Sequence, residues 1–209
     1  MNGYFAVEGP IGVGKTTLAE QLSKHYSGKL ILELAEENPF LNDFYKDRAR
    51  FAFQTQIYFL MSRYKQQEEF IHRDLFSETV VADYIFAKDR IFANINLSDK
   101  ELGLYDRVAG ALEKNIVKPD LVIYLTASIE SLVARIKKRN RHFEKSLDKE
   151  YLEIVCDAYS DYFFHYNKTP MLIIKTDQCD FTRDRDKFDY LVEKINSGLR
   201  QTEYITFES

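Results

Sequence analysis

The stretch Gly9-Pro10-Ile11-Gly12-Val13-Gly14-Lys15-Thr16 matches the full G-x-x-x-x-G-K-[ST] pattern of a phosphate-binding loop. An apolar run at residues 4–7 precedes it and predicts a buried strand, whereas Leu18, Ala19 and Leu22 follow at helical spacing. The motif requires this strand–loop–helix context. Backbone N–H groups and the helix N-terminus then surround a polyphosphate. The sequence therefore predicts a site for a nucleoside triphosphate.

The residues of this loop have separable roles. Lys15 is long enough to reach the outer phosphates, and the Thr16 hydroxyl can hold Mg²⁺. We therefore expect ATP, together with Mg²⁺, to bind to the residues from Gly9 to Thr17.

Length and composition limit the class of protein. The 209 residues suffice for one α/β domain with a proper core and are too few for two, so we expect a single domain over residues 1–209. The content of 45% hydrophobic and 30% charged residues is typical of a soluble globular protein. A net charge of -4 argues against a general nucleic-acid binder, which would carry a basic excess.

The chain also gives expectations about location. No apolar run approaches the length that spans a membrane, and the first predicted strand begins so close to Met1 that we expect no signal peptide. Cys156 and Cys179 are too few for a disulfide framework and lack the spacing of metal ligands. Free thiols are typical of a reducing cytosol. We therefore expect a cytoplasmic protein with no membrane partner.

Strand and helix patterns alternate along the chain, which predicts an α/β fold with a doubly wound parallel sheet of about five strands. A capping box at residues 98–101 and a cap at Ser128 predict two of the helix starts. The expected strands are residues 4–7, 30–33, 79–82, 121–125 and 171–174. The expected helices after the one that follows the loop are residues 41–46, 50–73, 85–94, 98–114, 128–139, 149–166 and 188–199.

Three acids stand at or near predicted strand ends, where doubly wound sheets bind ligands. Asp83 follows a buried strand and has the place of an acid that holds Mg²⁺ directly or through water; a simple helix cap is the alternative. Glu33 ends the second strand, expected beside the first, and could accept the proton of an attacking hydroxyl. Glu36 and Glu37 compete with Glu33 for that role, and Glu8 is the third strand-end acid.

Five cations within seven residues mark the end of one predicted helix, namely Arg135, Lys137, Lys138, Arg139 and Arg141. Such a run can be a solvated face that favours the helix dipole, or a nucleic-acid patch, which the acidic net charge disfavours. Beside a phosphate loop, a lid that closes over ATP is the favoured interpretation.

The long helix predicted at residues 50–73 carries Gln54, Gln56 and Arg63. A Gln amide offers a donor and an acceptor that match a nucleobase edge. Gln56 and Arg63 are seven residues apart and therefore share a helix face. A solvent-exposed Gln is the alternative.

These motifs occur together in the order seen in deoxyribonucleoside kinases, and the chain resembles that family from Phe5 to at least Tyr151. It resembles most the bacterial deoxyguanosine/deoxyadenosine kinase branch, in which a strand ends in Ala-Asp-Tyr. The resemblance implies a P-loop kinase with an Arg-rich lid at about residues 139–149. The motifs after the loop are Glu33, Glu36-Glu37-Asn38-Pro39-Phe40, Tyr45-Lys46-Asp47, Phe53-Gln54-Thr55-Gln56 with Arg63, Ala82-Asp83-Tyr84 and residues 135–141.

The resemblance also assigns roles by position. Glu33 matches the carboxylate that takes the proton of the nucleoside 5′-hydroxyl, while Lys15 and Thr16 match the loop lysine and the metal-side hydroxyl. Arg139 and Arg141 match lid arginines that clamp the phosphates, and Arg135 is expected at the ATP. The positions that match the acceptor site are Tyr45 and Glu144 at the sugar 3′-hydroxyl, Gln56, Arg63 and Asp89 at the base, and Phe92 packed against the base.

One position departs from the family pattern. Many members have Arg after the strand-end acid, where it helps to position the 5′-hydroxyl and phosphate, but here that place is Tyr84. Tyr supplies no guanidinium. Either a lid arginine replaces the missing cation or this branch uses another arrangement.

The expected activity is the ATP- and Mg²⁺-dependent phosphorylation of a purine deoxyribonucleoside at its 5′-hydroxyl, with guanine or adenine left open. Cytosine, which the Gln56 amide also matches, is the less favoured base. The resemblance also implies a homodimer. A nucleoside monophosphate kinase of the thymidylate type is one alternative, and a non-catalytic nucleotide switch is another. The chain lacks the Asn-Lys-x-Asp element that a GTPase switch needs.

Overall fold

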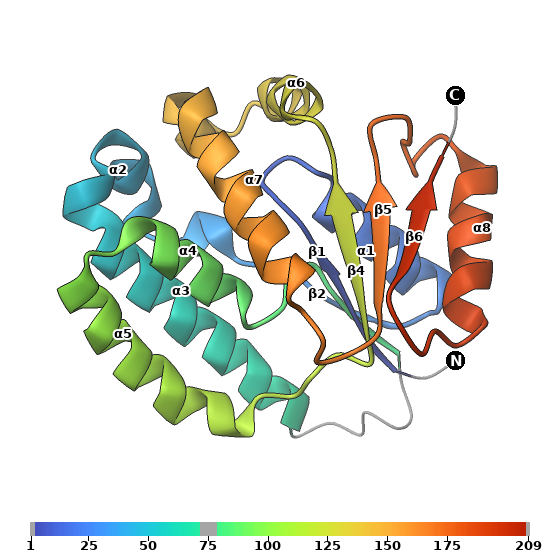
Figure 1. Ribbon diagram of the computed structural model, residues 1–209, viewed down its shortest axis with the longest axis horizontal. Coiled ribbons are helices and arrows are strands. Elements are labelled where there is room, and N and C mark those ends of the chain that lie inside the picture. Colours follow the sequence, from blue (N-terminus) through green and yellow to red (C-terminus); the bar gives the residue numbers. More distant parts are fainter. Residues whose placement is uncertain (1–2, 72–78, 208–209) are drawn as a thin grey trace.

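The computed structural model describes residues 3–71 and 79–207, and its strands form one parallel sheet (Figure 1). The strands are β1 (Tyr4–Glu8), β2 (Lys29–Ile31), β3 (Val80–Ala82), β4 (Leu121–Thr126), β5 (Met171–Lys175) and β6 (Glu203–Thr206). Within the described residues their order is β2-β3-β1-β4-β5-β6. Phe5 of β1 lies opposite Val81 of β3 on one side and Leu121 of β4 on the other.

Helices connect successive strands. They are α1 (Lys15–His25), α2 (Leu41–Lys46), α3 (Arg48–Ile71), α4 (Lys88–Asn96), α5 (Asp99–Leu112), α6 (Ile129–Arg139), α7 (Lys149–Phe164) and α8 (Arg185–Asn196). The predicted end of the long helix at Arg73 lies outside the described residues. In the part of the chain that the structure describes, no helix is both long enough and apolar enough to cross a lipid bilayer.

The central strands are buried on both faces, as expected for a parallel sheet. Alternate residues of a strand point to opposite faces, so Phe5 and Val7 pack with α1 and α8. Tyr4 and Ala6 pack on the other face with residues of α4 and α7; Figure 1 shows α7 crossing in front of the sheet. Two apolar layers therefore fix the sheet.

Helices α3, α4 and α5 lie side by side to the left of the sheet in Figure 1. They pack through a further apolar cluster that includes Leu60 of α3, Ala93 of α4 and Tyr105 of α5. This packing holds the polar faces of α3 and α4 against the segments that follow β2 and β3.

The sheet corrects two expectations. Within residues 3–71 and 79–207 it has six strands and not about five. The sequence pattern missed β6, in which Ile205 is buried and Tyr204 is exposed. β2 pairs with β3 and not with β1, so the expected neighbourhood of the first two strands is wrong. All three residues of β3 are buried, whereas β2 buries only Ile31. The more buried strand therefore lies inside the sheet, next to β1, and β2 forms the edge.

Two helices begin three residues away from their predicted starts. α4 begins at Lys88 and not at Ile85, because residues 83–87 form the turn that follows β3. α8 spans Arg185–Asn196, about three residues earlier than predicted. The caps were predicted correctly: Ser128 accepts a hydrogen bond from the Ser131 N–H at 3.3 Å, and a capping box starts α5.

We expect Ser98→Ala to lower the free energy of unfolding by about 1 kcal/mol, the usual cost of a lost N-cap. The Ser98 backbone N–H donates to Glu101 Oε2 at 2.9 Å and its hydroxyl donates to the same oxygen at 2.6 Å. Urea denaturation measures the change. Turnover should stay unchanged, because α5 begins away from the pocket, and an unshifted midpoint would contradict the role of this cap.

Candidate active site

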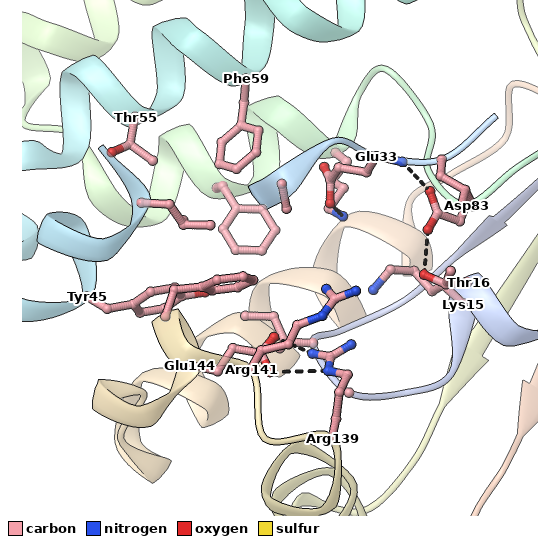
Figure 2. A pocket seen from close by; sticks show the side chains of 18 of the residues that line it. Lys15, Thr16, Glu33, Tyr45, Thr55, Phe59, Asp83, Arg139, Arg141 and Glu144 are labelled. Carbon is pink, nitrogen blue, oxygen red and sulfur yellow. Dashed lines mark hydrogen bonds and ion pairs between the residues drawn. The ribbon is translucent and has the colours of Figure 1, made fainter. Parts of the chain in front are cut away.

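A pocket of about 330 Å³ opens at the carboxyl ends of the central strands (Figure 2). The phosphate loop, the segment after β2, helices α3 and α4 and the loop after α6 all contribute to its walls. The structure brings most of the predicted residues together here. Those that line the pocket are Ile11, Gly12, Gly14, Lys15, Thr16, Thr17, Glu33, Tyr45, Gln56, Arg63, Asp83, Phe92, Arg139, Arg141 and Glu144.

Six predicted residues do not line this pocket, namely Gly9, Pro10, Val13, Tyr84, Asp89 and Arg135. The Arg135 guanidinium donates to the Val13 carbonyl at 3.1 Å and to the Thr176 hydroxyl at 3.0 Å, so it braces the loop from behind. That these six residues contact a ligand stays a prediction.

Tyr84 is one of these six residues. Its side chain is fully buried, and its hydroxyl donates to Gln66 Oε1 at 2.7 Å. Gln66 in turn donates to the Leu32 carbonyl at 2.9 Å. Tyr84 therefore supports the segment that carries Glu33 from behind.

The glycines of the phosphate loop adopt backbone angles that other residues avoid. Gly9 has a φ of 148°, and a Cβ there would stand 2.4 Å from the Leu125 carbonyl oxygen. Gly12 has a φ of 84°, and its Cβ would stand 2.7 Å from Ile136. Both angle and space therefore require glycine. The loop leads directly into α1, whose N-terminus is suited to an anion.

Lys15 lies within this loop. Its ammonium donates to the carbonyls of Gly9 at 2.8 Å and Pro10 at 3.0 Å. Burial, followed by the nearby ammonium of Lys88, lowers the pKa of Lys15 to about 8. The side chain is thus ready to exchange two carbonyl contacts for phosphate oxygens.

ATP affinity is expected to fall by up to tenfold per pH unit above pH 8. Below that pH Lys15 is charged, whereas above it the amine must regain a proton before it can bind phosphate. Titration calorimetry between pH 7 and 9.5, in two buffers of different ionisation enthalpy, should show proton uptake on binding above pH 8. Constant affinity across this range would contradict the lowered pKa.

Two oxygen ligands meet on the floor of the pocket. The Thr16 hydroxyl donates to Asp83 Oδ2 at 2.6 Å, and Asp83 Oδ1 accepts the Glu33 backbone N–H at 2.7 Å (Figure 2). A hydroxyl and a carboxylate beside a phosphate loop fit Mg²⁺, which takes few protein ligands and completes its shell with phosphates and water. Among the described residues, no cluster of three or more His, Cys, Asp or Glu could hold a metal without such help.

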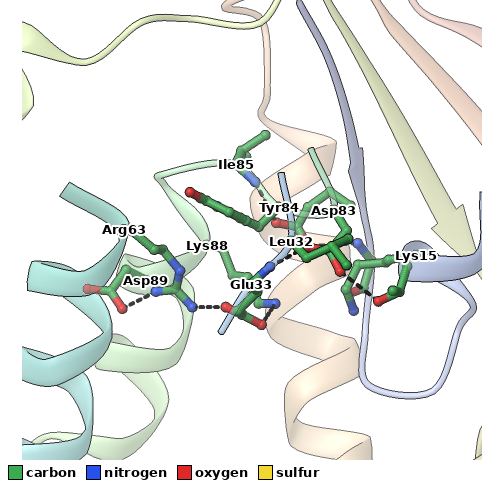
Figure 3. Close-up of polar contacts among 12 residues, drawn as sticks. Lys15, Leu32, Glu33, Arg63, Asp83, Tyr84, Ile85, Lys88 and Asp89 are labelled. Carbon is green, nitrogen blue, oxygen red and sulfur yellow. Dashed lines mark hydrogen bonds and ion pairs between the residues drawn. The ribbon is translucent and has the colours of Figure 1, made fainter. Parts of the chain in front are cut away.

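Glu33 stands between two cations (Figure 3). Arg63 Nη2 donates to one of its oxygens, and Lys88 Nζ donates to the other at 2.6 Å. Burial alone would raise the pKa of the Glu33 carboxyl, but Lys88 and Arg63 together lower it far below its usual range. Glu33 is therefore held as a carboxylate.

A buried chain of polar groups continues from Arg63 into the helical layer. Arg63 Nη1 donates to Asp89 Oδ1, and the Tyr105 hydroxyl donates to Asp89 Oδ2 at 2.8 Å. Burial, opposed by Arg63, raises the pKa of Asp89 to about 6. Among the described residues, Gln56 Oε1 and Arg63 Nε are buried without a hydrogen-bond partner, which suits a ligand edge with its own donors and acceptors.

The opposite side of the pocket carries the lid residues (Figure 2). Tyr45 stacks on Phe143 with ring centroids 6.3 Å apart. Arg139 forms a two-point ion pair with the buried Glu144. Arg141 faces the pocket from the turn beyond α6. Asn140, the residue that follows the helix, has a left-handed conformation with a φ of 52°.

Sequence reasoning missed several lining residues, including Thr55, Phe59, Lys88 and Phe143. Thr55 stands one residue before Gln56 and Phe59 three residues after it. Both therefore lie close to Gln56 on the predicted helix, and this proximity could have indicated them. Lys88 directly precedes Asp89. The sequence gives no signal that its ammonium reaches Glu33, since the two residues are 55 positions apart.

Glu8 was singled out as a strand-end acid without a role, and the structure supplies one. Its side chain is fully buried. One oxygen accepts the Gly9 N–H at 3.0 Å and the other accepts the Ile85 N–H at 3.1 Å, and the Tyr159 hydroxyl donates at 3.3 Å. Glu8 therefore ties the phosphate loop to the turn before α4.

A phosphate loop on a parallel sheet, with a strand-end Asp and a carboxylate across the pocket, defines a P-loop phosphotransferase. Comparison with known families agrees: a sequence model described as "Deoxynucleoside kinase" matches residues 5–200. The chain belongs to the deoxynucleoside kinase family. The match favours nucleoside kinase over the thymidylate-type enzyme and the nucleotide switch.

Two similar curated proteins are named as kinases of a purine deoxyribonucleoside. The chain is 36% identical over 197 residues to a deoxyguanosine kinase of Bacillus subtilis (strain 168), covering 92% of this chain and 95% of that protein. It is 37% identical over 162 residues to a deoxyadenosine kinase of Dictyostelium discoideum, covering 76% of this chain and 66% of that protein. The chain thus resembles kinases of both purine deoxyribonucleosides.

Solved structures show the same fold. A deoxyadenosine kinase from M. mycoides with bound dCTP superposes with a TM-score of 0.81 at 27% identity, covering 93% of this chain and 99% of that one. The same enzyme with bound dATP gives a TM-score of 0.79 at 26% identity, with equal coverage. Nucleotides are therefore the ligands of these structural relatives.

Proposed function

We propose that this chain transfers the γ-phosphoryl group of ATP to the 5′-hydroxyl of a purine deoxyribonucleoside, deoxyguanosine or deoxyadenosine. The observation that carries the proposal is the position of Glu33. Its carboxylate lies in one pocket with the phosphate-loop residues Lys15 and Thr16 and with the polar helix residues Gln56 and Arg63. The names of the relatives in both purine classes support this choice of base.

The donor site is assigned to the phosphate loop. ATP phosphates would lie against the loop amides and the start of α1, with Lys15 at the outer phosphates. Thr16 and Asp83 would hold Mg²⁺, which when bound neutralises charge on the phosphate oxygens. In this assignment Asp83 also fixes the Glu33 backbone through the hydrogen bond at its other oxygen.

The acceptor site is assigned to α3, α4 and the lid. The Gln56 amide has a free acceptor oxygen, and Arg63 has a free Nε–H, so together they can pair with a purine edge. Phe92 lines the same side and would pack against the base. Tyr45 and Glu144 lie opposite and would bind the sugar 3′-hydroxyl.

The chemical step then follows. The 5′-oxygen forms a bond to the γ-phosphorus, the bond from that phosphorus to the bridging oxygen breaks, and ADP leaves with the electron pair. The proton of the 5′-hydroxyl passes to Glu33. Arg139 and Arg141 would clamp the phosphates and, with the lid closed, exclude water, so that ATP is not simply hydrolysed.

A transfer assay with radiolabelled ATP tests this function. Each of the four deoxyribonucleosides, and each of their monophosphates, is offered separately, and products are resolved by chromatography. The proposal expects labelled deoxyguanosine or deoxyadenosine monophosphate and no comparable diphosphate. Preference for a pyrimidine would reject the purine assignment, and consumption only of monophosphates would reject the nucleoside acceptor.

Three further assignments stay proposals: one domain over residues 1–209, from the length of the chain, a cytoplasmic location, from its free thiols, and a homodimer, from the resemblance. Size-exclusion chromatography with light scattering measures the mass of the assembly against the 24.6 kDa of one chain. A mass of one chain would reject the dimer.

A further inference from the structure

Lys88 has the position of a reactive group although nothing in the sequence pattern marked it. It is the first residue of α4 and is buried, 5% exposed, yet it lines the pocket. Figure 3 shows its side chain reaching from α4 to the carboxylate of Glu33, where the ammonium donates at 2.6 Å. A buried ammonium is costly unless it is paired, and the ion-pair partner of Lys88 is the Glu33 carboxylate.

The other cations of the pocket are already engaged elsewhere. Lys15 donates to the carbonyls of the phosphate loop. Arg63 holds Asp89 as well as Glu33, while Arg139 is paired with Glu144 and Arg141 with Glu36. Lys88 itself is paired with Glu33 and forms no second ion pair within the described residues.

The position after the strand-end acid does not supply a cation to this place. Tyr84 is fully buried and its hydroxyl is bonded to Gln66. Lys88 stands four residues further on, at the end of the turn that begins with Asp83, and its backbone N–H donates to the Ile85 carbonyl at 3.1 Å. The turn thus directs the Tyr84 ring away from the pocket and places the Lys88 ammonium on its acceptor side.

Proton transfer changes the partner of this ammonium. When Glu33 accepts the 5′-hydroxyl proton, its negative charge is lost and Lys88 is left buried beside a neutral acid. At the same time the phosphoryl group, which keeps its negative charge throughout the transfer, becomes bonded to the 5′-oxygen from which Glu33 took the proton. The Lys88 ammonium, which pairs with Glu33 before the transfer, is therefore free to contact the product phosphate once Glu33 is protonated.

We propose that Lys88 is a catalytic residue of the acceptor side, which pairs with Glu33 before transfer and then contacts the phosphoryl group on the 5′-oxygen. The proposal rests on the proposed function and adds the cation that accompanies the base. It also answers the departure at Tyr84: the missing charge comes from α4 and not from the lid.

Lys88→Met keeps the length of the side chain and removes its charge. We expect kcat to fall about 100-fold or more, with the KM for ATP changed less than threefold. Lys88→Arg should retain kcat within about tenfold of wild type, because the charge is restored. Lys100 is exposed near the start of α5. Lys100→Met is therefore the matched control and should leave both kcat and the KM for ATP unchanged.

A spectroscopic readout separates contact from packing. The second pKa of a free phosphate monoester is about 6, and a lysine at the phosphate lowers it. The ³¹P titration of bound deoxynucleoside monophosphate should therefore show a pKa higher by about one unit or more in Lys88→Met than in wild type. Lower turnover with an unchanged ³¹P titration would assign Lys88 a packing role and overturn the proposal.

The remaining outcomes also decide. Wild-type turnover in Lys88→Met would overturn the proposal while leaving the kinase function intact. If Lys88→Met does not fold, Lys88→Arg decides: retained kcat supports a charge requirement, and a loss of more than 100-fold in the folded protein overturns it. A wild-type protein that phosphorylates no deoxyribonucleoside rejects the proposed function itself.

Discussion

Glu33→Gln should lower kcat by about two or more orders of magnitude while ATP still binds. The amide cannot take up the 5′-hydroxyl proton, and loss of a general base typically costs this much. ATP affinity should persist because the loop glycines, Lys15 and Thr16 are untouched. Steady-state kinetics measures the first effect and titration calorimetry the second.

The nearby glutamates offer a matched control for this variant. Glu37 is exposed and lies outside the pocket, so Glu37→Gln should keep wild-type turnover. Because Glu33→Gln leaves the buried cations Arg63 and Lys88 without their shared anion, a thermal melt must accompany the kinetics. Turnover within tenfold of wild type in folded Glu33→Gln would remove this carboxylate from the mechanism.

Lys15→Met should lower kcat/KM for ATP by about 10²- to 10³-fold, the scale for losing one preorganised donor at a developing charge. The side chain already lies in the loop, with its ammonium on the Gly9 and Pro10 carbonyls. Phosphate oxygens would take the place of those carbonyls. Binding of the nucleoside alone, measured by calorimetry, should remain within about threefold of wild type.

Lys24→Met is the control for this second variant. Lys24 is exposed in the last turn of the same helix, so the two substitutions remove the same charge from opposite ends of α1. We expect normal kinetics from it. Equal losses in both variants would show that general charge, and not the loop position, determines ATP use.

The phosphate loop could be predicted in full because its signal is local. Glycine spacing, the preceding apolar run and the following helix all lie within about twenty residues. Glu33 was placed at the site from a wrong premise, since β3 separates β2 from β1. The prediction still reached the pocket because the carboxyl ends of parallel strands meet at one edge of a sheet.

The remaining parts depend on packing between distant segments. β6 pairs with β5 at the sheet edge and has a single buried residue, Ile205, too little for a periodic signal. The contact of Lys88 with Glu33 requires α4 to dock against the segment after β2. No local pattern of charge or polarity specifies that docking, so the contact between Lys88 and Glu33 could not be predicted from the sequence.

The fully buried carboxylate of Glu8 has a consequence for redesign. It holds Gly9 with one oxygen and Ile85 with the other, so one side chain spans the two halves of the reaction centre as a rigid brace. Substitutions in the turn that carries Ile85, introduced to widen the choice of nucleobase, would strain the opposite half through this brace. Variant libraries made to accept other nucleosides should therefore be screened for retained ATP affinity from the first round.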